Sequence, residues 1–284
     1  MATATQSRTI QTQRVRALIV PREHGAWGML LVPLATGAGV GLLANGRVFP
    51  LVLLTLLALA LFWLRTPVES LLGTSPMRAQ TEGERRLVLQ AILWLASVAT
   101  LSLTALLWDA NGVRFLLFGA IASVAFIGQA ILKQLGRNLR MSAQVVGALG
   151  LTASAPAAYF VMTGHLDSRA AALWLANWLF AGDQIHFVQL RIHASRVGGW
   201  KEKFERGQFF LIGQFGMAAL LGFVVYYHFL PSLSVIAFVP VFLRGMAWFL
   251  QKPQPLLVRR LGWTELAHAL AFGALLVAGF QLAR

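Results

Sequence analysis

The sequence of 284 residues contains no cysteine. Disulfides, thiolate metal sites, haem or iron–sulfur clusters held by cysteine, and cysteine nucleophiles are therefore excluded. Charged residues are also scarce, at 12% of the chain, against about 25% in soluble domains. Because 57% of the residues are hydrophobic, most side chains must face lipid or one another, and we expect an integral membrane protein.

Acidic residues are the scarcest charged type, with 10 Asp and Glu against 24 Lys and Arg, which gives a net charge of +14. In a soluble protein such an excess indicates nucleic-acid binding. In a membrane protein the same excess can be a topology signal. The positions of the basic residues decide between these two interpretations.

Nine apolar segments are long enough to cross a bilayer, which takes about 17–25 residues. They are residues 25–44, 48–64, 87–107, 113–132, 141–163, 170–190, 207–229, 232–250 and 263–282. These are unbroken apolar runs and not the ten-residue alternating segments of a membrane barrel. We therefore predict an all-α polytopic membrane protein with about nine transmembrane helices.

The basic residues alternate strongly between the two sides of these nine segments. The N-terminal arm and every second connection hold 20 Lys and Arg, counting Arg244 near the end of the eighth segment, whereas the other connections and the C-terminus hold four. By the positive-inside rule the N-terminus is cytoplasmic and the C-terminus lies outside. The charge thus orients the chain in a bacterial inner membrane, with the lipid bilayer as its partner, and excludes nucleic acid.

The predicted organisation is simple. Residues 1–20 are basic, rich in Thr and Gln, and predicted to form a flexible arm, and residues 21–284 form a single transmembrane helical domain. The long connections lie on the cytoplasmic side, so a functional site is expected there. Walker, dinucleotide-binding, metalloprotease and G-x-S-x-G motifs do not occur.

The first polar candidate lies at the start of the first apolar segment. Arg22, Glu23 and His24 stand between Pro21 and the helix. They form a potential catalytic and substrate-binding cluster facing a cytoplasmic cavity. The alternative is an ordinary helix start, since Pro in the first turn and Glu near the helix dipole are both favoured there.

The second candidate follows the second apolar segment, where Arg65 and Glu69 precede Arg85 and Arg86. A carboxylate among arginines suits a diphosphate, with or without a metal ion. Residues 66–69 also fit a capping box that would start a short helix in the loop and leave Glu69 without a catalytic role. The arginines also suit anchoring to lipid headgroups.

The third candidate is a polar stripe at the end of the sixth apolar segment. At 100° per residue its members fall within about 140° of arc on one helix; they are Asp183, His186, Gln189, His193 and Arg196. Asp183 lies inside the membrane, where an ionisable group is a functional candidate by default. The alternative is an internal hydrogen-bonded pair. A metal site lacks an evident further ligand, and no metal ligands are predicted.

Smaller polar signals lie near the C-terminus. Glu265 and His268 share one face at the cytoplasmic start of the ninth helix. Arg191 lies within the span of the polar stripe and is predicted, with Gln189 and Glu265, to bind substrate. Arg244 lies inside the eighth apolar segment, where snorkelling to the interface would explain it.

Residues 21–33, Pro-Arg-Glu-His-Gly-Ala-Trp-Gly-Met-Leu-Leu-Val-Pro, resemble the opening signature of the YwiC-like family of bacterial membrane proteins. Three later elements are similar to later motifs of that family: Arg65-x-Pro67, the run from His186 to Arg191, and Leu261-Gly262-Trp263-x-Glu265. The resemblance spans most of the chain after residue 20 and implies no established activity.

The architecture also looks like the UbiA superfamily of intramembrane prenyltransferases. In those enzymes the loops after helices two and six carry Asp-rich motifs that hold Mg²⁺ and a prenyl diphosphate. Here neither N-D-x-x-D nor D-x-x-x-D occurs, so Mg²⁺-dependent prenyl transfer is in doubt and the cofactor is unknown.

Three functions remain open from the sequence. The first is a UbiA-like binder or transferase acting on a lipid-soluble, isoprenoid-type substrate, with Glu23, His24, Glu69, Asp183 and His186 as its catalytic residues. The second is a transporter of a small solute or anion, with a proton relay through the polar stripe. The third is a non-catalytic partner in membrane assembly.

Overall fold

The computed structural model describes residues 14–21, 24–73, 77–109, 112–195, 197, 199–252 and 256–283. Every regular element in these ranges is helical, which confirms the all-α prediction. The chain forms two compact units, one of residues 1–24 and 49–112 and the other of residues 25–48 and 113–284. The division into an arm and a single domain at residue 20 stays a prediction.

The first unit contains α3 (Val48–Leu72), α4 (Glu82–Leu107) and a short helical stretch over residues 14–19. The short stretch packs on α3, since Ser70 and Trp63 donate hydrogen bonds to the Leu18 and Ile19 carbonyls at 3.0 and 2.8 Å. Arg14 Nε reaches Glu84 Oε1 at 2.6 Å. The hydrogen bond to this carboxylate raises the pKa of the Arg14 guanidinium.

The capping box predicted over residues 66–69 is wrong, because α3 continues through these residues with Pro67 inside the helix. The capping box of this unit lies instead at the start of α4. There the Thr81 hydroxyl accepts from the Glu84 amide, and the Glu84 carboxylate accepts from the Thr81 amide. The backbone amides of Thr81 and Glu84 at the start of α4 thus both have hydrogen-bond acceptors.

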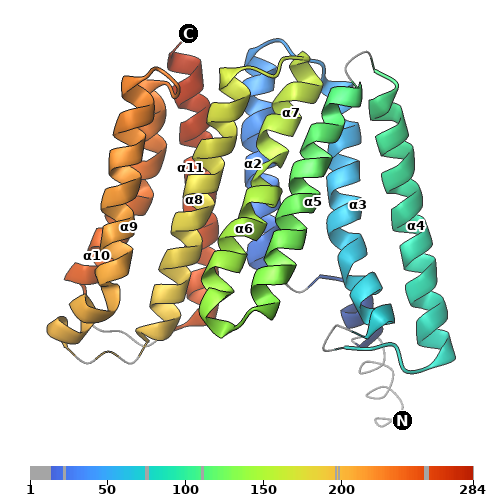
Figure 1. Ribbon diagram of the computed structural model, residues 1–284, viewed down its shortest axis with the longest axis horizontal. Coiled ribbons are helices and arrows are strands. Elements are labelled where there is room, and N and C mark those ends of the chain that lie inside the picture. The colour runs from blue at the N-terminus through green and yellow to red at the C-terminus, as the bar shows by residue number, and fades with distance from the viewer. Residues whose placement is uncertain are drawn as a thin grey trace, which may run out of the picture. The chain divides into compact units, whose positions relative to one another are not determined.

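The second unit is a bundle of long helices that run side by side in Figure 1. Its elements are α2 (His24–Leu43), α5 (Gly112–Gln134), η1 (Arg137–Leu139), α6 (Arg140–Thr152), α7 (Ser154–Thr163), α8 (Ser168–His193), α9 (Trp200–Tyr226), η2 (Ser232–Phe238), α10 (Val239–Leu250) and α11 (Val258–Leu282). The C-terminal elements η2, α10 and α11 pack together, and α8 contacts α6, α7, α9, α10 and α11.

Two predicted helices are interrupted by proline. The segment predicted over 141–163 divides into α6 and α7 at Ala153. Pro156 has no amide hydrogen to donate to the Thr152 carbonyl and its ring clashes with that carbonyl, so the α-helix cannot continue unbroken. Likewise, the segment predicted over 232–250 begins as the 3₁₀ helix η2, and Pro240 lies in the first turn of α10.

Helix α8 lies at the core of the second unit and holds more buried positions than its neighbours. Phe180 on α8 stacks on Phe272 of α11 with ring centroids 4.1 Å apart. Close packing also joins α2 to α7, because a Cβ at Gly37 would lie 2.0 Å from the Ala155 carbonyl oxygen. Glycine at residue 37 is therefore required by helix packing, as small residues at membrane helix interfaces commonly are.

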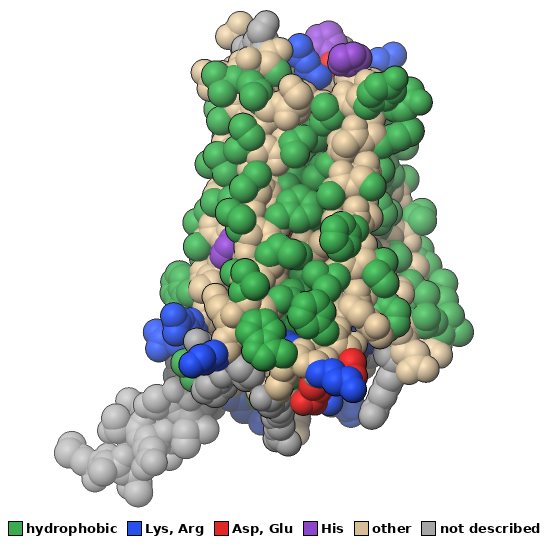
Figure 2. All heavy atoms as spheres, turned by 90° about the vertical axis from the view of Figure 1, so that its left-hand side faces the viewer, with side chains coloured by type: hydrophobic (Ala, Val, Ile, Leu, Met, Phe, Trp, Pro, Cys, Tyr) green, Lys and Arg blue, Asp and Glu red, His purple; other side chains and the backbone are tan. Residues whose placement is uncertain are grey.

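Seven helical stretches in the described residues are long and apolar enough to cross a membrane. They are α3, α4, α5, α6 with α7, α9, η2 with α10, and α11. Figure 2 shows a broad band of hydrophobic side chains, with Lys and Arg gathered toward the two ends of the face in view. On α9 the exposed side chains include Phe209, Phe215 and Phe223, with 70%, 72% and 59% exposed. The chain is therefore a multi-pass helical membrane protein.

Helices α2 and α8 coincide with the two other predicted segments, and the described apolar part of α2 is Trp27–Leu43. In α8 the polar residues near its end lower the mean hydropathy. The count of nine crossings and the orientation thus stay predictions.

Candidate functional site

A buried charge cluster joins four helices of the second unit. Arg244 on α10 binds Asp183 on α8 through Nη2, 2.5 Å from Oδ2. Its Nη1 binds Oε2 of Glu265 on α11. The side chains of Arg244, Asp183 and Glu265 are 7%, 0% and 8% exposed. One guanidinium thus bridges two carboxylates from different helices.

Gln214 on α9 completes this buried charge cluster by donating a hydrogen bond to Asp183 Oδ1. Both carboxylate oxygens of Asp183 therefore accept hydrogen bonds from buried side chains. Glu265 differs, because its Oε1 atom is buried and has no hydrogen-bond partner among the described residues. Gln214 Oε1 and Arg244 Nε are also buried and without a partner in this part of the chain.

The surroundings of the cluster are mostly apolar and partly aromatic. The Arg244 guanidinium lies 4.1 Å from the ring centroid of Phe187, within the range of a cation–π contact. Gln184 on α8 donates to the backbone carbonyl of Glu265 at 3.1 Å. His186 packs edge-on against Phe210 of α9 at 5.2 Å between ring centroids.

The cluster contains two acids and one base from the same buried region, so its charges do not cancel by themselves. Ions buried without full compensation are strongly destabilising, and buried groups neutralise by binding a proton or a further charge. Ionisable groups inside transmembrane helices typically mark proton, ion or substrate sites. The cluster is therefore chemically suited to exchange a proton.

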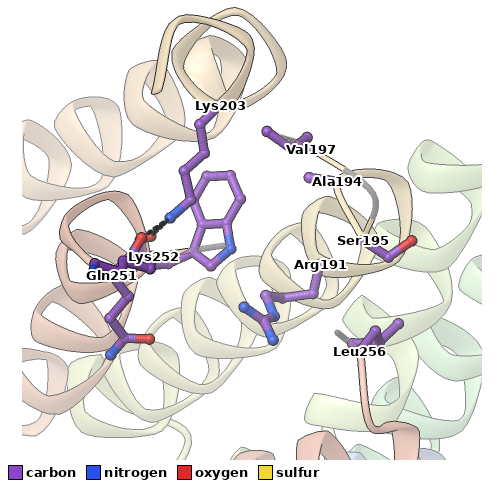
Figure 3. Close-up of a pocket in the computed structure, with 9 residues that line it drawn as sticks. Arg191, Ala194, Ser195, Val197, Lys203, Gln251, Lys252 and Leu256 are labelled. Atoms are coloured by element: carbon purple, nitrogen blue, oxygen red, sulfur yellow. Dashed lines mark hydrogen bonds between the residues drawn. The ribbon is translucent and has the colours of Figure 1, made fainter. Parts of the chain in front are cut away.

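A basic pocket opens at one end of α8, α9 and α10. The pocket itself is small, about 20 Å³, within about 360 Å³ of space that includes open solvent. It is lined by Arg191, Ala194, Ser195, Val197, Lys203, Trp248, Gln251, Lys252 and Leu256. Figure 3 shows Arg191 extending from α8 into this space. Arg191 is half-buried, so its cationic side chain forms part of the pocket lining.

Lys203 holds one wall of the basic pocket. Its buried ammonium group donates to the carbonyls of Trp248 and Gln251, at 2.5 Å for Gln251, as Figure 3 shows. These carbonyls lie at the end of α10, where the helix itself provides no donors. Lys203 also lies 4.7 Å from the Trp248 ring centroid. Lys203 therefore caps the C-terminal end of α10.

The polar stripe predicted on α8 divides between two neighbouring regions. Asp183 faces Gln214 and Arg244, whereas Gln189 donates to Gln144 of α6 at 3.0 Å. Gln189 follows Asp183 by six residues, which is one full turn of the helix plus about 240°. The two side chains therefore point about 120° apart and meet different partners. His193 is exposed and bonds to the Gln189 carbonyl, and Arg196 lies outside the described residues.

The predicted residues near the N-terminus lie in the first unit or outside the described residues. Arg65 binds Glu69 within α3, with Nε 2.8 Å from Oε1. Arg85 and Arg86 are exposed in the first two turns of α4. Arg22, Glu23 and the side chain of His24 lie outside the described residues. Their catalytic and substrate-binding roles stay predictions.

The sequence interpretation of Arg244 as a residue that snorkels to the interface is wrong, because its guanidinium is buried between two carboxylates. No sequence pattern predicted a role for Gln214. A signal for Arg244 did exist, since an arginine within an apolar segment requires a partner. Choosing that partner requires the rotation of each helix about its axis, which the sequence pattern does not fix.

No group of three or more His, Cys, Asp or Glu side chains in the described residues is arranged to hold a metal ion. The two carboxylates of the cluster share a guanidinium instead.

Comparison with known protein families gave one match, to the family described as YwiC-like protein, over residues 20–159. The matched residues include the opening motif at 21–33 and Arg65-x-Pro67, whereas the later motifs near residues 186 and 261 lie beyond them. Neither the curated proteins nor the solved structures contained a match. The resemblance of the opening motifs to the YwiC-like family is thus confirmed over residues 20–159, nearly half of the chain.

Proposed function

We propose that this protein binds the anionic headgroup of a lipid-soluble, isoprenoid-type substrate in the basic pocket. One observation carries the proposal: three cationic residues, Arg191, Lys203 and Lys252, line a pocket whose other residues include Trp248 and Leu256. A phosphate or diphosphate suits the cations, because guanidinium and ammonium groups form strong charge-assisted hydrogen bonds with it. An apolar chain suits the aromatic and aliphatic residues at the same opening.

The proposal includes nine transmembrane helices in a bacterial inner membrane, with the N-terminus in the cytoplasm and the C-terminus outside. In the second unit, the α5–α6, α8–α9 and α10–α11 connections lie at one end (Figure 1). The described basic residues at or near this end are Lys133, Arg140, Arg191, Lys201, Lys203, Arg206, Lys252, Arg259 and Arg260, against Arg47, Arg114 and Arg169 at the other. This asymmetry supports a cytoplasmic position for the basic pocket.

A UbiA-like transferase is the enzymatic form of this proposal. Arg191 and Lys252 would hold the diphosphate, and the carboxylates of the buried charge cluster would accept a proton from the second substrate. Arg22, Glu23, His24, Arg65, Glu69, Arg85 and Arg86 remain proposed catalytic or substrate-binding residues. The cluster itself favours a second candidate, a proton-coupled anion transporter, because it places ionisable groups within transmembrane helices.

The test is a binding measurement with purified protein in lipid nanodiscs. Three probes separate the contributions: farnesyl diphosphate carries chain and charge, farnesol carries the chain alone, and inorganic diphosphate carries the charge alone. We expect farnesyl diphosphate to bind most tightly. Arg191→Gln and Lys252→Gln should each weaken it by about tenfold or more, because a hydrogen bond to a charged group contributes roughly 1.5–3 kcal/mol.

The matched controls are Arg259→Gln and Arg260→Gln, which remove exposed basic residues at the start of α11 outside the pocket lining. These variants should bind as the unmodified protein does. Equal binding of inorganic diphosphate and farnesyl diphosphate would favour the anion transporter. Equal losses in all four variants, or no binding of any probe, would contradict the proposal and favour a role in membrane assembly.

A further inference from the structure

His186 on α8 differs from two other histidines of the long helices in its hydrogen bonding. His193 and His268 each place Nδ1 close to the backbone carbonyl oxygen four residues earlier, at 2.8 and 2.7 Å. For His186 the corresponding carbonyl belongs to Gly182, and neither ring nitrogen has a hydrogen-bond partner in the ranges that the structure describes. The ring packs edge-on against Phe210 instead. Its donor and its acceptor nitrogen are thus both left for a ligand.

His186 lies at the depth of the hydrocarbon core. Its Nδ1 is 3.3 Å from the point where a Cβ on Gly213 would stand, and Gly213 is the middle residue of the 27-residue helix α9. At 1.5 Å per residue, Gly213 is about 20 Å from either end of that helix. Lipid tails offer no hydrogen bonds there, so an imidazole N–H without a partner is costly. A charged imidazole without a counter-ion would cost more, so the ring is neutral.

The seam between α8 and α9, which run side by side (Figure 1), has an inner and an outer side. Asp183 and Gln214 meet on the inner side, where both are buried. Gly213 and Gly216, three residues apart on α9, are exposed. His186 is half-buried beside Gly213 and therefore borders the outer side, which faces lipid.

Open space adjoins His186 on this outer side. A Cβ added at Gly182 or at Gly216 would have no atom within 4 Å. Gly182 precedes His186 by about one helical turn, and Gly216 follows Gly213 by nearly one turn, so both helices present bare backbone there. Glycine allows a ligand to approach the backbone closely. A flat ring suits this surface.

We propose that His186 is the polar group of a second ligand site, on the outer side of the α8–α9 seam, which binds the ring carbonyl of a quinone-type molecule dissolved in the membrane. The neutral imidazole donates its N–H to the carbonyl oxygen, and the ring lies against the backbone at Gly182 and Gly216. A quinone combines a flat ring, an acceptor oxygen and no charge. Binding changes no covalent bond. The site does not rest on the proposed function of the basic pocket.

The test is photolabelling of the purified full-length protein in lipid nanodiscs with an azidoquinone, followed by mass-spectrometric mapping of the labelled peptides. We expect saturable labelling of α8 and α9 that unlabelled decylubiquinone displaces. Farnesol has a hydroxyl group and no ring, and squalane has no oxygen. Both should displace the label much less well than decylubiquinone does.

Variants locate the ligand. His186→Phe keeps a ring and removes the hydrogen bond, so quinone binding should weaken by about two- to tenfold, as the loss of one neutral hydrogen bond predicts. Gly216→Leu should block the place of the quinone ring. The matched control is Gly222→Leu, which fills equally open space six residues further along α9 and should bind normally. His186→Phe should also resist unfolding by sodium dodecyl sulfate as well as the unmodified protein, because it removes a polar group from lipid.

Three results would overturn the inference: unchanged labelling in His186→Phe, equal losses in Gly216→Leu and Gly222→Leu, or equally good displacement by farnesol or squalane. Stability measured in the same preparations separates lost binding from lost folding. The probes carry no charge, so the quinone titration and the diphosphate titration of the basic pocket are independent, and either proposal can fail alone.

Discussion

Replacing Arg244 by Gln removes the only side chain seen to bridge Asp183 and Glu265 in the described residues. Two buried carboxylates then lie close together without their shared cation. Removing one partner of a buried ion pair destabilises a protein by roughly 3–5 kcal/mol. At about 1.4 kcal/mol per factor of ten, the ratio of folded to unfolded protein should fall between about a hundredfold and a few thousandfold.

The matched control is Arg65→Gln, which also removes one arginine from an ion pair. Arg65 and Glu69 are 36% and 38% exposed and lie four residues apart on α3. Such exposed pairs contribute about 0.3–0.5 kcal/mol. The assay is unfolding in mixed micelles with increasing sodium dodecyl sulfate, followed by tryptophan fluorescence, for both variants and the unmodified protein.

A triple variant separates uncompensated charge from lost packing. Asp183→Asn and Glu265→Gln combined with Arg244→Gln replace the charges by amides of similar size, so most of the lost stability should return. If Arg244→Gln costs no more than Arg65→Gln at neutral pH, the role assigned to the buried charge cluster is refuted.

Two further predictions concern the framework around the site. Gly37→Ala should strongly reduce the yield of folded protein, because the added Cβ would meet the Ala155 backbone. Gly28→Ala should not reduce the yield, because no atom lies within 4 Å of its added Cβ. Size-exclusion chromatography of both variants measures the yields, and equal yields would contradict the prediction. Thr81→Ala should lower the free energy of unfolding by about 1 kcal/mol through loss of the α4 capping box, measured in the same micelle assay, and no change would show that this helix start does not limit stability.

Hydropathy located the helices well but not their ends. All nine predicted segments coincide with helical stretches, because long apolar runs in a chain with few charges have no stable alternative to membrane helices. Helices α4, α9 and α11 begin at Glu82, Trp200 and Val258, several residues before the predicted starts at 87, 207 and 263. Hydropathy marks the apolar part of a helix and misses its polar first turns, of which that of α4 is stabilised by a capping box.

Asp183 and Glu265 were identifiable as candidates because acids are rare in this chain and these two lie in or beside apolar segments. Arg191 and Gln189 were also predicted, although the structure places Gln189 against Gln144 and not in the cluster. The periodicity gave the relative angles of side chains on one helix. It could not show which neighbouring helix each angle faces.

The sequence by itself determined that this is a helical membrane protein and where its apolar segments lie, since composition and run length follow directly from the order of residues. Only the tertiary structure decided that Arg244 bridges Asp183 and Glu265, which lie 61 and 21 residues from it along the chain. The physical reason is that helix rotation and pairing result from packing over whole surfaces, including the fit of Gly37 against Ala155.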